Sequence, residues 1–138
     1  MTASYVDIED NALDDGHHLF VGRLPESLRP DAAGFDALWA IHPDRHHVIR
    51  MHGHSFETPR WQQAYGVDHH HTGRTNAALP VPPDLDPFQD WARRAIGGRI
   101  YGLLIKWYDG DLGHCIGAHQ DSVEEMVSEV PIVTKSLG

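Results

Sequence analysis

Residues 103–138, LLIKWYDGDLGHCIGAHQDSVEEMVSEVPIVTKSLG, decide which fold the sequence is expected to adopt. They continue an apolar and aromatic run that begins at Arg99, so a strand is expected over 99–108. Asp109-Gly110 then predicts a turn. Three further elements are expected downstream: a short strand over 115–120, a loose helical turn over 122–129 and a strand over 131–137. The C-terminal part of the chain is therefore expected to open a β-sheet.

The residues before this segment predict a mixture of helices and strands. The expected elements are strands over 17–24, 47–51 and 61–65 and helices over 31–41 and 86–96. Residues 66–87 lack a regular period, and irregular stretches of this length are usually functional or disordered. We expect a single α+β domain over 1–138. Within it, 17–98 form an N-terminal α/β extension and 99–138 the opening strands of a mainly β core.

The composition is typical of a folded, acidic protein that is rich in histidine. The chain has 138 residues, of which 20 are acidic, 11 basic and 12 histidine, and its net charge is −9. This balance argues against a surface that binds nucleic acid without specificity, because such affinity comes from lysine and arginine. The sequence lacks an apolar run of about 20 residues that could span a membrane. An acidic N-terminus without a signal peptide and a single cysteine predict a cytoplasmic protein.

One short motif carries the candidate chemistry, His119-Gln120-Asp121. On an extended backbone, residues two positions apart point to the same side, so His119 and Asp121 can hold one cation together. Two histidines and one carboxylate form the facial triad that binds non-haem Fe(II) and leaves positions open for O₂ chemistry. The motif alone has low specificity, and the residues around it decide its interpretation.

Those surroundings resemble the AlkB-like Fe(II)/2-oxoglutarate dioxygenases. The likeness rests on two blocks in the order that the family has them. The first block is Pro59-Arg60 followed by Tyr65-Gly66, similar to the family's nucleotide-recognition lid; Thr72-Gly73 and the run 79–82 also fit it. The second block is a strand ending in Tyr108, then Ile116-Gly117, His119, Asp121 and Pro131-Ile132-Val133. The resemblance extends over about residues 17–138.

This resemblance implies a double-stranded β-helix, the jelly-roll core also found in cupins, with N-terminal helices and a nucleotide-recognition lid. It implies Fe(II) bound by His119 and Asp121, and 2-oxoglutarate beside Tyr108 and Lys106. The implied reaction uses O₂ and 2-oxoglutarate to hydroxylate the methyl group of an alkylated base, which then leaves as formaldehyde.

The implied substrate is an alkylated nucleic-acid base that is flipped out of its stack to reach the metal. Arg60, Trp61 and Tyr65 are the residues expected beside it, as a cation and an aromatic platform. Because the chain is acidic, single-stranded DNA or RNA is favoured over duplex DNA.

The sequence departs from the family pattern in two places. Lys106 stands where the family has an asparagine, and neither a histidine nor an arginine follows Asp121, although the family uses both on later strands. The core is therefore expected to be incomplete at its C-terminus, with an open sheet edge through which two chains could pair. Two alternatives stay open. One is a catalytically inactive binding module or pseudoenzyme, and the other a histidine-rich, cupin-like metal-binding protein that uses His69, His70 and His71.

Overall fold

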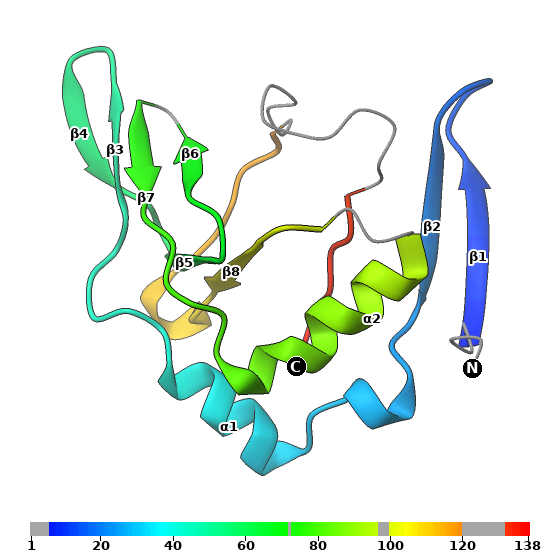
Figure 1. The fold of residues 1–138 in the computed structure, drawn as a ribbon. Coiled ribbons are helices and arrows are strands. Elements are labelled where there is room, and N and C mark those ends of the chain that lie inside the picture. Colours follow the sequence, from blue (N-terminus) through cyan, green and yellow to red (C-terminus); the bar gives the residue numbers. More distant parts are fainter. Residues whose placement is uncertain (1–5, 72, 97–99, 120–131) are drawn as a thin grey trace.

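The protein is described here by a computed structural model, which covers residues 6–71, 73–96, 100–119 and 132–138. These residues form a mixed fold of two α-helices and several small antiparallel sheets (Figure 1). The helices are α1 (Ala32–Ala40) and α2 (Asp86–Ile96). The strands are β1 (Val6–Ala12), β2 (His18–Arg23), β3 (Val48–Met51), β4 (His54–Glu57), β5 (Trp61–Tyr65), β6 (His69–His71), β7 (Arg74–Asn76) and β8 (Leu103–Trp107). Neither helix is long and apolar enough to cross a membrane.

Three strand pairs are hairpins of neighbouring strands: β1–β2, β3–β4 and β6–β7. The turn between β3 and β4 consists of His52 and Gly53, both with positive φ (50° and 79°), and Met51 pairs with His54 across it. Two-residue hairpin loops favour this backbone geometry because it matches the twist of the strands. The expected strands over 17–24 and 47–51 are confirmed, whereas their partners β1 and β4 were not expected. The β6–β7 hairpin lies in the stretch that was expected to be irregular.

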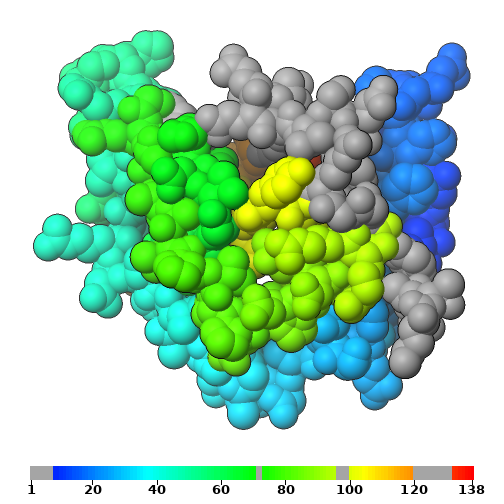
Figure 2. All heavy atoms as spheres, in the orientation of Figure 1, coloured from blue at the N-terminus to red at the C-terminus, as the bar shows by residue number. Residues whose placement is uncertain are grey.

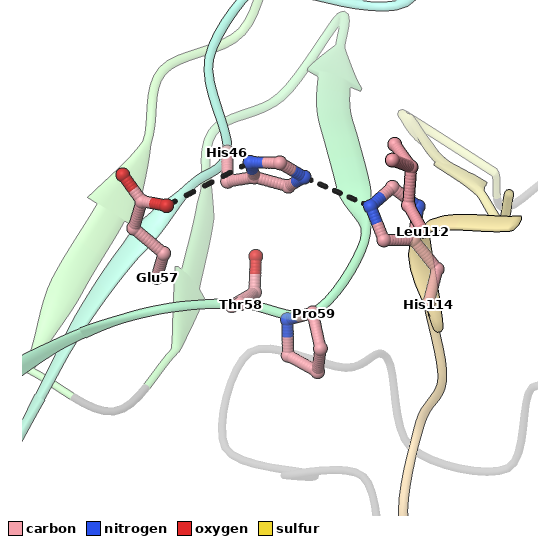
Figure 3. Close-up of a pocket in the computed structure, with 6 residues that line it drawn as sticks. All are labelled: His46, Glu57, Thr58, Pro59, Leu112 and His114. Atoms are coloured by element: carbon pink, nitrogen blue, oxygen red, sulfur yellow. Dashed lines mark hydrogen bonds and ion pairs between the residues drawn. The ribbon is translucent and has the colours of Figure 1, made fainter.

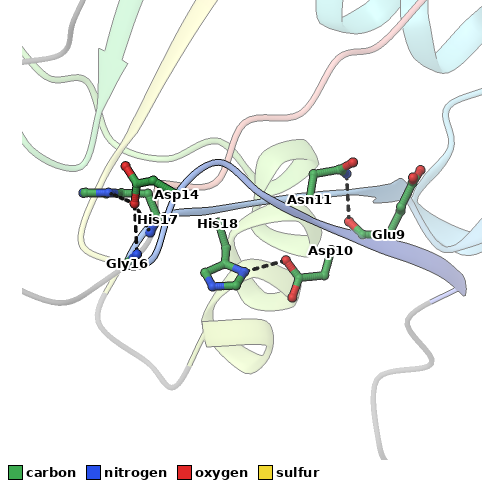
Figure 4. Close-up of polar contacts among 7 residues, drawn as sticks. All are labelled: Glu9, Asp10, Asn11, Asp14, Gly16, His17 and His18. Carbon is green, nitrogen blue, oxygen red and sulfur yellow. Dashed lines mark hydrogen bonds and ion pairs between the residues drawn. The ribbon is translucent and has the colours of Figure 1, made fainter.

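The turn of the β1–β2 hairpin is held by the side chain of Asp14 (Figure 4). Asp14 Oδ1 accepts hydrogen bonds from the backbone N–H of Gly16 at 2.9 Å and of His17 at 3.0 Å. The hydrogen bond from Gly16, followed by that from the His17 side chain, lowers the pKa of the Asp14 carboxyl. Farther along the hairpin, His18 Nδ1 lies 2.8 Å from Asp10 Oδ1. An acidic turn residue thus closes the hairpin with local hydrogen bonds.

The hydrophobic core lies between the helices and the fourth strand pair, β5–β8. These strands are antiparallel, and Trp61 faces Trp107 while Tyr65 faces Leu103. The core consists of buried Tyr65, Leu85 and Trp107 and of the partly buried Leu38, Trp39, Trp61, Val81, Phe88, Leu103 and Ile105. Figure 2 shows α2 across one face of the molecule, between the β6–β7 and β1–β2 hairpins. The two helices and the strands β5 and β8 were expected from the sequence and are confirmed, although β8 is shorter than the expected strand over 99–108.

The C-terminal residues 132–138 do not form the strand expected over 131–137, so that prediction is wrong for them. Their burial nevertheless alternates, with Val133, Lys135 and Leu137 half-buried and their neighbours exposed. The inner side packs on α2, where Lys135 contacts Phe88 and Trp91, and the terminal Gly138 lies against the ring of Phe35 in α1. The alternation of half-buried and exposed residues in this segment therefore arises because one side of it is packed, and not because it belongs to a sheet. Residues 115–119 are not a strand either, and the helical turn expected over 122–129 lies outside the described residues.

Lys135 is the charged residue on this inner side. Its Nζ donates a hydrogen bond to the backbone carbonyl of Phe88 and lies 5.4 Å and 5.2 Å from the ring centroids of Phe88 and Trp91. Burial lowers the pKa of Lys135 from 10.5 to about 8. The folded protein therefore holds this proton less tightly than the unfolded chain does, and the stability of the fold rises as the pH increases from about 8 to 10.5.

Replacing Lys135 with methionine is expected to raise the free energy of unfolding at pH 7 by about 1 kcal/mol. This free energy is well below the value that the whole pKa shift of Lys135 would give, because solvent screens a partly exposed group. The gain over wild type should shrink as the pH rises through this range, which urea unfolding at several pH values would measure. Arg94→Met, at an exposed position of α2, is the matched control and should show no such trend. A Lys135→Met protein that is less stable at every pH would contradict the prediction.

Candidate functional site

The β5–β8 pair has a polar face on the side away from the core. Residues alternate between the two faces of a sheet, so Gln62 and its direct partner Lys106 lie opposite the core side chains Trp61 and Trp107. We call the group made of Arg60, Gln62, Lys106 and Tyr108 the polar face; Arg60 and Tyr108 continue the alternation at the ends of their strands. Lys106 and Tyr108, both expected at the 2-oxoglutarate site, are thereby brought together with Arg60.

Arg60 is a buried cation on this face. Its residue surface is 7% exposed, and its Nη1 donates a long hydrogen bond of 3.4 Å to the backbone carbonyl of Cys115. The Nε atom is buried without a hydrogen-bond partner, and within the described residues no carboxylate forms an ion pair with the guanidinium. A buried charge without a counter-charge is costly. This arrangement is therefore suited to an anionic ligand.

Tyr108 supplies a hydroxyl group next to this cation. Burial raises the pKa of the Tyr108 phenol, the charge of Arg60 lowers it and Cys115 raises it, with burial the largest of the three effects. Arg60 comes directly before Trp61 and Tyr108 directly after Trp107, and these two tryptophans pair in the sheet, so both residues lie at the same end of the strand pair. Because the phenol keeps its proton at neutral pH, it can donate a hydrogen bond to a carboxylate.

Gln62 is a site residue that the sequence analysis missed. Only 2% of its surface is exposed, and in the part of the chain that the structure describes neither its side-chain oxygen nor its nitrogen has a hydrogen-bond partner. Buried amides are nearly always satisfied, so an unsatisfied one calls for an explanation such as a ligand. The sequence did contain a signal for this residue. Gln62 lies two positions after Arg60, so alternation along β5 puts both side chains on the same face.

Trp61 and Tyr65 lie on the opposite face from Arg60, although the sequence analysis expected all three beside a flipped base. Tyr65 is part of the core, and burial raises the pKa of its phenol. The Trp61 ring stacks on His42, with centroids 3.9 Å apart and an angle of 13°, and on His46 at 5.4 Å and 7°. Two imidazoles thus already stack on the Trp61 indole, where the sequence analysis expected a base.

His119 is exposed and has the tautomer that metal-bound histidines use. Its Nδ1 lies 2.9 Å from the backbone carbonyl of Gly117. A carbonyl only accepts hydrogen bonds, so Nδ1 carries the proton and the lone pair is on Nε2. Histidines that bind metal commonly donate their other N–H to a carbonyl in this way. His119 thus fits an iron ligand, and Asp121 lies outside the described residues.

The histidines of the β6–β7 hairpin are the candidate ligands of the alternative metal-binding protein. His70 Nδ1 lies 2.7 Å from Thr75 Oγ1. Within residues 6–71, 73–96, 100–119 and 132–138, no three histidine, cysteine or acidic side chains lie close enough to hold a metal ion. The alternative of a metal-binding histidine cluster in this hairpin gains no support from the described residues.

The polar face and His119 are thus the features that bear on function, and they lie on β5, on β8 and on the segment that follows β8. They include residues from both of the blocks on which the resemblance rests. No protein-family model and no curated protein matches this chain.

Proposed function

We propose that this chain carries part of the active site of an AlkB-like Fe(II)/2-oxoglutarate dioxygenase, whose core is the jelly roll that the resemblance implies. The reaction would demethylate alkylated bases of single-stranded DNA or RNA. One observation carries the proposal above the others: the buried guanidinium of Arg60, which has no carboxylate partner among the described residues, lies at the same end of the β5–β8 pair as Tyr108.

The polar face fits 2-oxoglutarate because this cosubstrate is a dicarboxylate. Arg60 offers several N–H donors, Lys106 offers a positive charge, and the Tyr108 hydroxyl offers a donor. The chain as a whole is acidic, with a net charge of −9. Two cations on neighbouring strands of such a protein attract an anion to this one face. The lysine at position 106, where the family has an asparagine, would add charge to the pocket for the carboxylate.

His119 and Asp121 are the residues that would hold the iron. Bound Fe(II) would supply the activation of O₂ that oxidises 2-oxoglutarate and the methyl group of the base. The hydrogen bond from His119 Nδ1 to Gly117 orients the imidazole, and Nε2 would be the atom that binds the iron. In this proposal the base would also approach Arg60, so that the substrate and the cosubstrate would meet at the end of the strand pair where Arg60 and Tyr108 lie.

The proposal is tested by adding Fe(II) and 2-oxoglutarate to the chain without oxygen. The expected result is a weak visible absorption band from charge transfer between iron and 2-oxoglutarate. His119→Ala should abolish this band, because the change removes an iron ligand. His54→Ala is the matched control, since His54 is an exposed histidine on β4, and it should leave the band unchanged.

Two results would contradict the proposal. One is a wild-type chain that binds neither 2-oxoglutarate nor Fe(II) in titration calorimetry. The other is a His119→Ala variant that retains the full absorption band. Formation of succinate that increases when a methylated single-stranded oligonucleotide is added would support the nucleic-acid substrate.

A further inference from the structure

A second group of titratable side chains lines a pocket of about 310 Å³ (Figure 3). The pocket is formed by the loop before β3, the end of β4 and the segment after β8. Its lining residues are His46, Glu57, Thr58, Pro59, Leu112 and His114. His46 and His114 are 68 positions apart in the sequence, and their Nε2 atoms are 2.9 Å apart. Figure 3 shows His46 between Glu57 and His114.

The contacts around the two imidazoles determine where their protons are. The backbone N–H of Asp109 donates to His114 Nδ1 at 3.1 Å, so this nitrogen has no proton. A neutral His114 then carries its proton on Nε2 and donates it to His46 Nε2. His46 in turn carries its proton on Nδ1, which lies 3.8 Å from Glu57 Oε2. The network therefore holds two imidazole protons, one on each ring.

We propose that His46 and His114 form a proton-operated latch, which fastens the segment after β8 to the loop before β3 and opens when the pair takes up one further proton. The reason is the number of ring nitrogens that are available to a further proton. A third proton must go either to His114 Nδ1, where it meets the N–H of Asp109, or between the two Nε2 atoms, where a proton already lies. Either position turns a hydrogen bond into a contact between two donors, so that one link has to break.

The charged groups around the pair are few. Glu57 on β4 is exposed and attracts the proton on His46 Nδ1. Asp109 contributes its backbone N–H, while its Oδ1 accepts a hydrogen bond from the N–H of Asp111. Arg60 binds the carbonyl of Cys115, the residue after His114.

The same contacts argue against a metal ion between the two rings. A metal would need the lone pairs of both Nε2 atoms, and a neutral His114 would then have a proton on Nδ1. That proton would point at the N–H of Asp109. Glu57 lies on the Nδ1 side of His46 and not on the side of the shared contact. The contacts thus fit a shared proton better than a shared metal.

The latch is tested by nuclear magnetic resonance of the histidine side chains in the metal-free chain. At pH 8, His46 should be protonated on Nδ1, which is the less common tautomer of free histidine, and His114 on Nε2. When the pH is lowered until the pair takes up its further proton, the Asp109 amide signal should shift together with the His46 and His114 signals.

A matched pair of variants separates the latch from local packing. His114→Asn keeps an oxygen that can accept from the Asp109 N–H, but it lacks the atom that reaches His46. It should abolish the pH-dependent shift of the Asp109 amide and the tautomer preference of His46. His52→Asn, in the β3–β4 turn where asparagine tolerates a positive φ, should retain both.

Two results would overturn the inference. The first is a His46 that is protonated on Nε2 at pH 8, or an Asp109 amide that does not respond to pH in the wild-type chain. The second is Zn²⁺ binding through both Nε2 atoms when the metal is added to the wild-type chain, which would make the pair a metal site. None of these measurements depends on iron or 2-oxoglutarate, so the latch can fail while the proposed function stands.

Discussion

Replacing Trp107 with alanine is expected to destabilise the protein by about 3–5 kcal/mol, the cost of removing a large aromatic side chain from a core. Trp107 is 5% exposed and packs in the core with Tyr65 and Leu85. Its Nε1 donates a hydrogen bond of 2.9 Å to the backbone carbonyl of Leu38, which joins β8 to α1. Because total stabilities are only about 5–15 kcal/mol, a large fraction of the variant should be unfolded. Urea unfolding followed by circular dichroism measures this loss.

Trp107→Phe separates the ring from its hydrogen bond. Phenylalanine fills much of the same space but lacks the N–H, so a smaller loss of about 1–2 kcal/mol is expected. Tyr101→Phe is the control, because Tyr101 is an exposed aromatic residue outside the core, and its stability should equal that of wild type. A Trp107→Ala protein that loses less than about 1 kcal/mol would show that this core does not hold the strands and helices together.

Arg60→Met is expected to change stability and ligand binding in opposite directions. The substitution removes a buried guanidinium that has no carboxylate partner among the described residues. Replacing such a charge with an apolar side chain of similar length should stabilise the fold by about 1–2 kcal/mol. The same substitution removes charge-assisted hydrogen bonds to an anion, so the affinity for 2-oxoglutarate should fall roughly 100-fold.

Thermal unfolding and titration calorimetry on the same preparations measure the two effects. Arg50→Met is the matched control, since Arg50 is an exposed arginine on β3, and it should change neither quantity appreciably. The opposite pattern, a large loss of stability with unchanged affinity, would make Arg60 a structural residue. Because a misfolded variant would also lose affinity, the gain in stability is the half of the prediction that separates the two explanations.

The elements that the sequence predicted well are those whose own apolar pattern reflects packing. α2 has proline as its second residue and apolar side chains on one side, and β8 is a continuous apolar run. By contrast, β6 and β7 consist of HHH and RTN, which have no apolar alternation to detect. Their pairing follows from a short turn. Residues 132–138 show the opposite case. Their sequence has the apolar alternation of a strand, but the segment packs on the two helices and not in a sheet.

The site was harder to predict, because its face is set by pairing between distant segments. The sequence can place Lys106 and Tyr108 on one side of a strand, but not Gln62 opposite Lys106, which depends on the register of β5 and β8. Likewise, Trp61 looked like a stacking platform next to Arg60. Its position in the core, covered by two histidines from the loop before β3, follows from tertiary packing.

The pairing of β5 with β8 also sets the order in which the molecule can assemble. The three hairpins close across short turns, which isolated chains do within microseconds. Strands β5 and β8 must instead come together over an intervening segment of roughly 40 residues, and closing such a loop costs more entropy before any contact repays it. Arg60, Gln62 and Lys106 therefore meet only when the slowest contacts have formed. A folding intermediate that has its hairpins but not this pair would lack the proposed anion site, so binding of the proposed ligand would select the fully folded chain.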